Sequence, residues 1–299
     1  MYLNEESWHA QQENSYVIDE KIRNFLDIYA LIKRKNPRKE IFVSEDEEIY
    51  LKAEKYPLKK WLFDTDIEYR RLYLSFWNKR ITFKPEDEYE VNVGNVVLKG
   101  GTEAYLNDSF MISIGLDPKW EKKDITATLV SVYEEEQQIE IYNIYCKDQL
   151  DEERVKQIFY DKKTDIVKSY EDLWKQKEEL FPHLCFCPSV KDNLNKLEIF
   201  YLGQIVKKLF ELEDYCVNLG HENFNPSRLT KTTPESTTTL AQYEKEHTFT
   251  DEKGVKYLAN WHMRFTGIPG RIFFIPQYEK EKFLICYIGK KLKNVSYPT

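Results

Sequence analysis

The sequence predicts an α+β protein, in which helices and a small antiparallel sheet form a body that is followed by a C-terminal helix and an antiparallel meander. Three observations favour this class. Apolar residues recur every three or four positions, as in helices, in four segments: 19–35, 58–80, 150–180 and 192–219. Apolar and polar residues alternate, as in strands, around 125–146 and in 255–265. Turn residues such as Gly, Pro, Asn and Asp separate many of these segments.

Two helices that enter a core are expected in the first 80 residues. Segment 19–35 carries one apolar stripe, and Pro37 ends it because proline cannot continue a helix. Segment 58–80 carries an aromatic stripe that includes Trp61, Tyr73 and Phe76. Such a stripe at helical spacing indicates core packing rather than a platform for stacking nucleic-acid bases.

A small antiparallel sheet is expected over residues 85–146. Its strands are predicted at 90–99, 110–115, 125–133 and 138–146. The last two strands form a hairpin with Glu134, Glu135 and Glu136 at its tip, which is typical of a solvated turn. Helices are then expected over residues 150–219, with Gly220 as the C-terminal cap.

The chain is expected to divide into an acidic body, 1–220, a joint rich in turn residues, 221–232, and a basic module, 233–299. The module begins with a helix in which Thr233 is the N-cap and Pro234 the first residue. Strands follow at 247–250, 255–265, 271–275 and 283–288. On the long strand 255–265, His262 and Arg264 share the polar side, which is expected to be the open face of the sheet.

Charge sets the C-terminal end apart from the rest of the chain. The whole chain has a net charge of −7, but residues 253–299 hold nine Lys or Arg and two Glu, a balance of +7, so the first 252 residues carry −14. Two interpretations stay open. The basic segment docks on the acidic body, or it binds a polyanion such as RNA or another nucleic acid.

Composition also bears on location. No run of 18 apolar residues exists, so no membrane contact is expected. The first residues lack the basic and apolar regions of a secretory signal, and five cysteines without a spaced framework are typical of reduced thiols. These features predict a cytoplasmic protein.

No metal and no cofactor are expected. His183, Cys185 and Cys187 could supply zinc ligands, but no second Cys or His pair has the usual spacing, and buried thiols are the favoured interpretation. Gly100 and Gly101 lack the spacing and the lysine of a phosphate-binding loop.

The basic module holds groups that fit RNA cleavage without a metal. That reaction needs a base for the 2′-hydroxyl, positive charge for the phosphorane oxygens and an acid for the leaving oxygen. His262 could carry protons, and Arg264 could hold a phosphate on the same face. Arg271 joins this face if it pairs with Thr266, whereas a register slip of one residue removes it. The alternatives are a structural hydrogen bond for His262 and ion pairs with the body for both arginines.

Two phrases, Gly270 to Phe274 (GRIFF) and Ile285 to Lys290 (ICYIGK), give the module a resemblance to the RelE and ParE class of bacterial toxins, over about residues 233–297. The resemblance implies a metal-independent ribonuclease whose site positions match His262, Arg264, Arg271, Tyr287 and Lys290. Tyr287 and Lys290 have opposite parities, so both reach the site only if Gly289 introduces a bulge. Unlike this chain, those toxins are short and freestanding.

The exposed basic side chains expected to contact RNA are four lysines: Lys256, Lys290, Lys291 and Lys293.

Two functions are therefore predicted. The first is a bacterial defence or toxin-type protein whose C-terminal module binds RNA and is a candidate to cleave it. The second is a non-catalytic adaptor or sensor subunit, with protein partners, of a multiprotein antiphage complex. The whole chain resembles, in its general features, proteins that accompany bacterial antiphage systems.

Overall fold

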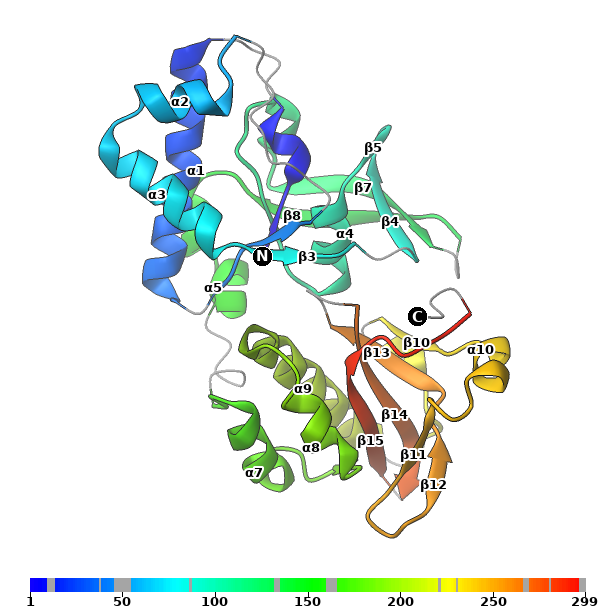
Figure 1. The fold of residues 1–299 in the computed structure, drawn as a ribbon. Coiled ribbons are helices and arrows are strands. Elements are labelled where there is room, and N and C mark those ends of the chain that lie inside the picture. The colour runs from blue at the N-terminus through cyan, green and yellow to red at the C-terminus, as the bar shows by residue number, and fades with distance from the viewer. Residues whose placement is uncertain are drawn as a thin grey trace. The chain divides into compact units, whose positions relative to one another are not determined.

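The computed structural model describes residues 1–9, 14–37, 39–45, 55–85, 88–131, 135–159, 166–219, 222–229, 231–265, 269–279 and 281–295. The chain is an α+β protein with two compact units, Met1–Tyr160 and Asp161–Thr299, called unit 1 and unit 2 below (Figure 1). Among the described residues, no helix is both long enough and apolar enough to cross a membrane.

Unit 1 is built on an eight-stranded mixed sheet in the order β3-β2-β1-β6-β8-β7-β4-β5. Its strands are β1 (Tyr2–Leu3), β2 (Phe42–Ser44), β3 (Ile81–Phe83), β4 (Tyr89–Val93), β5 (Val96–Val97), β6 (Met111–Ile112), β7 (Asp124–Ser131) and β8 (Gln137–Ile144). Its helices are α1 (Ser15–Lys35), α2 (Leu58–Asp64), α3 (Ile67–Lys79), α4 (Lys99–Leu106) and α5 (Glu153–Phe159). Short 3₁₀ helices span Glu5–Trp8, Pro118–Trp120 and Lys147–Asp151.

The predicted sheet at 85–146 is only part of this sheet. The hairpin of β7 and β8 is antiparallel as expected, but β3, β2, β1, β6 and β8 pair in parallel. The three N-terminal strands have two or three residues each, too few to show alternation, and their partners lie far away in the sequence. The tip residue Glu134 lies outside the described residues.

The aromatic stripe predicted to enter a core does so. Trp61 and Phe76 are fully buried, and Phe76 packs edge-on against Phe25 of α1 at a centroid distance of 5.2 Å. The predicted helix 58–80 is broken into α2 and α3 because the Asp66 carboxylate accepts hydrogen bonds from the backbone of Glu68 and Tyr69. An aspartate in this role starts a new helix.

Unit 2 is a five-stranded sheet in the order β10-β13-β14-β15-β9, antiparallel except for the β15–β9 pair, with a separate β11–β12 hairpin. Its strands are β9 (Leu184–Phe186), β10 (Thr232–Pro234), β11 (Thr248–Thr250), β12 (Lys256–Leu258), β13 (Trp261–Phe265), β14 (Gly270–Glu279) and β15 (Lys282–Lys290). Its helices are α7 (Tyr170–Leu180), α8 (Ser189–Leu194), α9 (Leu202–Leu219) and α10 (Thr237–Gln242), with 3₁₀ turns at Ile199–Tyr201 and Pro226–Arg228.

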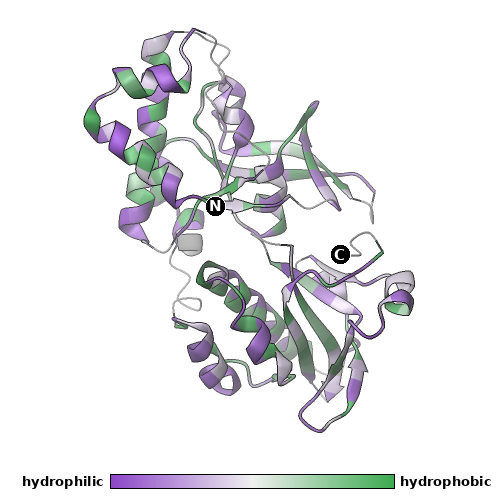
Figure 2. Cartoon of the chain, in the orientation of Figure 1, coloured by the Kyte–Doolittle hydropathy of each residue, from purple (hydrophilic) through white to green (hydrophobic). Residues whose placement is uncertain are grey.

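The core of unit 2 lies between the sheet and the helices that precede it. α8 and α9 cover one face, and α10 lies on the other side (Figure 1). Hydrophobic residues follow α9 and the central strands (Figure 2). Leu209 of α9 belongs to the same buried cluster as Met263, Ile272 and Ile285 of the strands. The predicted joint at 221–232 therefore differs from the observed division after Tyr160, since α9 and β9 share a core with the C-terminal strands.

Two local predictions in this unit are corrected. Thr233 lies in β10 and not at a helix start; the helix begins later, where the Ser236 hydroxyl accepts a hydrogen bond from the Thr239 backbone. The predicted strand 255–265 is split into β12 and β13. Between them, the Ala259 N–H donates to the His247 carbonyl, so the chain leaves one sheet and enters the other.

Candidate functional site

The four predicted catalytic side chains come from adjacent strands of the unit 2 sheet. Arg264 lies opposite Arg271, and His262 lies opposite Phe273, which in turn lies opposite Tyr287. Directly paired residues point to the same face, so His262, Arg264, Arg271 and Tyr287 share one face.

The register that achieves this differs by two residues from the expected one. Arg271 pairs with Arg264, whereas the sequence analysis assumed Thr266, which lies outside the described residues. A register shift of two residues leaves Arg271 on the same face of the sheet. The ladder runs without a bulge from Gly270 to Phe273, so Lys290, opposite Gly270, points to the other face from Tyr287.

The expected open basic face is covered. His262, Arg264 and Arg271 keep only 5%, 2% and 1% of their surface exposed. His247 packs edge-on against Phe273 at 5.1 Å, and its Nε2 donates to the Lys293 carbonyl at 3.0 Å. Residues 237–247 and the segment 291–295, called the cover below, thus close over this face.

Burial changes the chemistry of His262. Loss of hydration, and then the charges of Arg271 and Arg264, hold its pKa well below 6.5. Its Nε2 lies 3.1 Å from the Thr233 hydroxyl, while its Nδ1 is 3.8 Å from Glu235 Oε2, beyond hydrogen-bond distance. A neutral imidazole with a lowered pKa is a weak general base at neutral pH. The arrangement fits the structural alternative for His262.

Tyr287 is also engaged within the fold. Its hydroxyl donates to the Lys290 carbonyl at 2.9 Å, and burial raises its pKa. The ring lies over Gly289, where a Cβ would meet the Tyr287 oxygen at 2.4 Å. This glycine therefore makes room for the tyrosine, rather than forming the bulge that the sequence analysis considered.

The lysines expected to contact RNA are not side chains of that covered face, but Lys291 and Lys293 lie in the cover, and the charge of Lys291 helps to lower the pKa of His262. Lys256 is exposed on the β11–β12 hairpin, opposite Thr250. Lys290 and Lys293 are exposed and Lys291 is half-buried at the end of the chain's last strand and beyond it.

Lys231 is a cation that the sequence analysis did not single out. It lies just before β10, whose first residue, Thr232, pairs with Met263, and its backbone leaves the extended conformation at a φ of 54°. Lys231 therefore lies one residue before the strand that borders β13. No local pattern signals it, because β10 pairs with β13 about thirty residues later.

The zinc interpretation finds no support among the described residues, which contain no group of three or more His, Cys, Asp or Glu able to hold a metal. The His183 ring lies 2.6 Å from Glu213 Oε1, and all five cysteines are free thiols. Burial raises the pKa of Cys185, and contact between the Cys187 and Cys286 thiols lowers the pKa of the first and raises that of the second.

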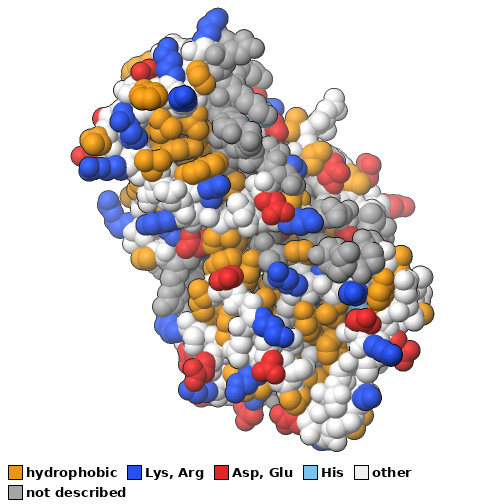
Figure 3. Space-filling model, in the orientation of Figure 1, with side chains coloured by type: hydrophobic (Ala, Val, Ile, Leu, Met, Phe, Trp, Pro, Cys, Tyr) orange, Lys and Arg blue, Asp and Glu red, His pale blue; other side chains and the backbone are white. Residues whose placement is uncertain are grey.

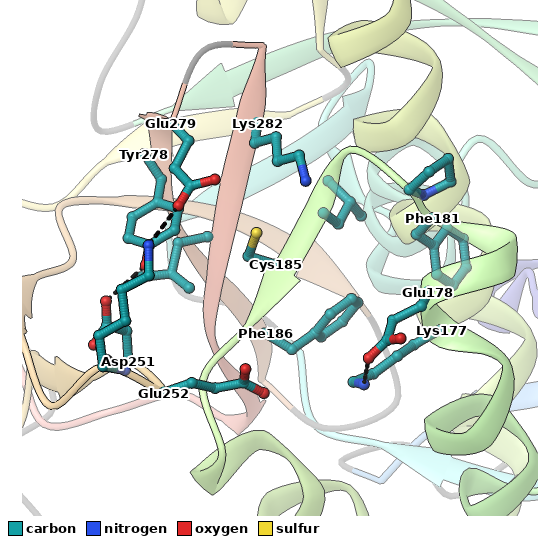
Figure 4. Close-up of a pocket in the computed structure, with 14 residues that line it drawn as sticks. Lys177, Glu178, Phe181, Cys185, Phe186, Asp251, Glu252, Tyr278, Glu279 and Lys282 are labelled. Atoms are coloured by element: carbon teal, nitrogen blue, oxygen red, sulfur yellow. Dashed lines mark hydrogen bonds and ion pairs between the residues drawn. The ribbon is translucent and has the colours of Figure 1, made fainter.

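A pocket of about 450 Å³ lies elsewhere in unit 2 (Figure 4). Its floor is formed by Cys185 and Phe186 of β9 and Leu284 of β15, and Phe181 after α7 closes one side. The turn at residues 251–253, with Tyr278, Glu279 and Lys282, closes the other side. A cavity of this size, partly apolar with a few polar groups, is typical of a ligand site.

Most charges around the pocket are paired. Lys253 contacts Glu279 at 2.7 Å, Lys177 contacts Glu178 at 3.0 Å, and the Tyr278 hydroxyl donates to Asp251 at 2.6 Å. That last bond raises the pKa of Tyr278 and lowers the pKa of Asp251. Within the described part of the chain, Lys282 and Glu252 form no ion pair, but Lys282 lies opposite Glu279 in the β14–β15 hairpin and its charge helps to lower the pKa of that carboxyl.

The pocket borders the outermost described strand of the sheet, β9. The His183 carbonyl accepts from Phe283, and the Cys187 N–H donates to Ile285, so alternate residues of this segment face β15. Of the intervening residues, Leu184 donates its N–H to the Phe181 carbonyl, so the backbone groups directed to the outer edge are the Leu184 carbonyl and those of Phe186. Of the pocket residues, the sequence analysis singled out only Cys185. Lys282 and Glu252 come near it through a strand register and a turn, which no sequence motif predicts.

Surface charge in unit 2 is mixed. Residues 161–299 contain 21 Lys or Arg and 19 Asp or Glu, so the C-terminal excess of cations is nearly balanced by acids of α7 to α9 and nearby segments. On the face drawn in Figure 3, basic and acidic side chains of this unit are interspersed.

Comparisons with known proteins give no family to which the chain could be assigned: no family model, no curated protein and no solved structure matches it.

Proposed function

We propose that this chain is a non-catalytic interaction protein, whose unit 2 binds an extended segment of a partner protein in the pocket beside β9. The observation that carries the proposal is the coincidence of a 450 Å³ pocket with the outermost described strand. Extended peptides bind sheet edges through backbone hydrogen bonds, and neighbouring pockets select their side chains. In the bacterial cytoplasm that the sequence predicts, the partner would be another subunit of a defence complex.

Selection from a library of phage-displayed random heptapeptides on the immobilised full-length protein tests this function. We expect enriched peptides whose synthetic versions bind in solution. Cys185→Trp places a large ring on the pocket floor and should weaken their binding at least about tenfold, since it removes the space they occupy.

Val217→Trp is the matched control, because Val217 is 59% exposed on α9 and does not line the pocket. Circular dichroism verifies that both variants are folded. Absence of any enriched peptide, or equal binding by the wild type and Cys185→Trp, would refute the proposal.

A second candidate function, RNA binding with metal-independent cleavage of the RelE and ParE kind, rests on a different observation. His262, Arg264, Arg271 and Tyr287 share one sheet face. Because that face is buried, this function requires the cover to open.

Labelled RNA incubated with wild type, His247→Ala and the double variant His247→Ala/Arg271→Ala tests the second function. His247→Ala removes the hydrogen bond to Lys293 that holds the cover. Cleavage that rises in His247→Ala and disappears in the double variant is expected. Intact RNA with all three proteins would rule this function out.

A further inference from the structure

Lys282 and Glu252, the two pocket charges for which the described residues provide no ion pair, lie near opposite ends of β9. Lys282 precedes Phe283, which pairs with Leu184, so Lys282 lies beside the start of β9. Glu252, in the turn at residues 251–253, lies near the other end of β9 (Figure 4). Figure 4 shows Cys185 between the two charged side chains.

The other charged groups that line the pocket already form hydrogen bonds or ion pairs within the protein. Lys253 forms an ion pair with Glu279, and Lys177 forms one with Glu178, so neither pair carries a net charge. Asp251 accepts from Tyr278 and from the backbone of Lys253 and Val255. Lys282 lies opposite Glu279 in the β14–β15 hairpin, so Lys253, Glu279 and Lys282 together leave one excess positive charge at this end of the pocket, and Glu252 supplies the negative charge at the other end.

The middle of the pocket favours uncharged groups. Cys185 is half-buried, and Leu284 beside it is 1% exposed. Burial raises the pKa of Cys185, with Lys282 opposing the increase and Glu252 adding to it, so the thiol is neutral at pH 7. A charged side chain above this floor would lose hydration without a partner.

Building on the proposed function, we propose that the pocket selects an extended peptide in which an acidic side chain meets Lys282, a basic side chain meets Glu252, and an uncharged side chain lies between them. β9 has three residues, which span about 10 Å at about 3.3 Å per residue. Side chains on one face of a strand are two apart. The acidic and basic residues of the ligand are therefore two or four positions apart.

The heptapeptide selection, repeated with Lys282→Glu, tests this specificity. With the wild type we expect peptides enriched in an acid and a base two or four residues apart. With Lys282→Glu, whose pocket then has acids at both ends, a base should replace the acid of the selected sequences. Wild-type peptides should bind the variant about fivefold or more weakly, because a favourable rim contact becomes a repulsion.

Lys191→Glu is the matched control, since Lys191 is exposed on α8 and does not line the pocket. It should select the same sequences as the wild type. Enriched peptides that lack the charge pattern, or an unchanged pattern with Lys282→Glu, overturn this inference and leave the proposed function standing. A failure to enrich any peptide refutes the proposed function itself.

Discussion

The imidazole of His262 shows how burial decides the chemistry of a single residue. In an open strand it would titrate near pH 6.5, but beside Arg264 and Arg271 and away from water its charged form is disfavoured. The same residue type at the same strand position can thus be a proton carrier or a structural group, and accessibility separates the two.

This lowered pKa makes stability depend on pH. The unfolded chain binds a proton at His262 near pH 6.5, and the folded chain binds it only at lower pH, so the stabilisation present above pH 6.5 is lost as pH falls below it. Urea unfolding at pH 8 and pH 5.5 should show a lower midpoint at pH 5.5. His262→Gln should reduce this difference; an equal difference in both proteins would contradict the prediction.

Thiol reactivity provides a second prediction for a single residue. Cys146 and Cys185 are half-buried, whereas Cys187, Cys216 and Cys286 are buried, so N-ethylmaleimide should modify only the first two in the native protein. A peptide bound in the pocket should protect Cys185 and leave Cys146 reactive, as peptide mapping by mass spectrometry would reveal. Equal protection of both, or of neither, would place the peptide elsewhere.

At the scale of elements, α4 is fixed closely against β1. The Glu5 carboxylate accepts hydrogen bonds from the Lys99 and Gly100 backbone at 2.5 and 3.1 Å, which satisfies N–H groups at the start of the helix. A Cβ at Gly100 would lie 2.0 Å from the Leu3 carbonyl oxygen. Only glycine allows this approach.

Gly100→Ala should therefore destabilise the protein by about 2 kcal/mol or more, because the backbone of β1 or α4 must move. Gly203→Ala in α9 is the control: nothing lies within 4 Å of its Cβ position, and alanine gains up to about 1 kcal/mol over glycine in a helix. Chemical denaturation would measure both. A neutral Gly100→Ala would mean that the contact is looser than described.

At the scale of the whole molecule, each unit has its own buried cluster, one around Phe25 and Phe76 and one around Phe274 and Ile285. Clusters that share no residues allow the units to respond separately to a core change.

Phe25→Ala and Phe274→Ala should each cost about 3–5 kcal/mol. Hydrogen exchange measured by mass spectrometry should show faster exchange in α1 and β8 for the first variant, and in β14 and β15 for the second. Faster exchange throughout the chain in both variants would show that the units unfold together.

Local sequence patterns by themselves determined the elements whose contacts are near in the chain. The apolar stripe of residues 19–35 predicts α1. The helix begins a few residues earlier than predicted, because the Asn14 side chain accepts a hydrogen bond from the Tyr16 backbone. Alternation of apolar and polar residues predicts the β7–β8 hairpin and the central strands of unit 2. Only the tertiary structure decided the parallel pairing of β1 with β2 and β6, the joining of β9 to β15, the cover over His262, and the meeting of Lys282 and Glu252 at the pocket. The physical reason is that each of these features depends on pairing and burial between segments that are far apart in the chain. Such contacts produce no periodic pattern of apolar residues in either segment.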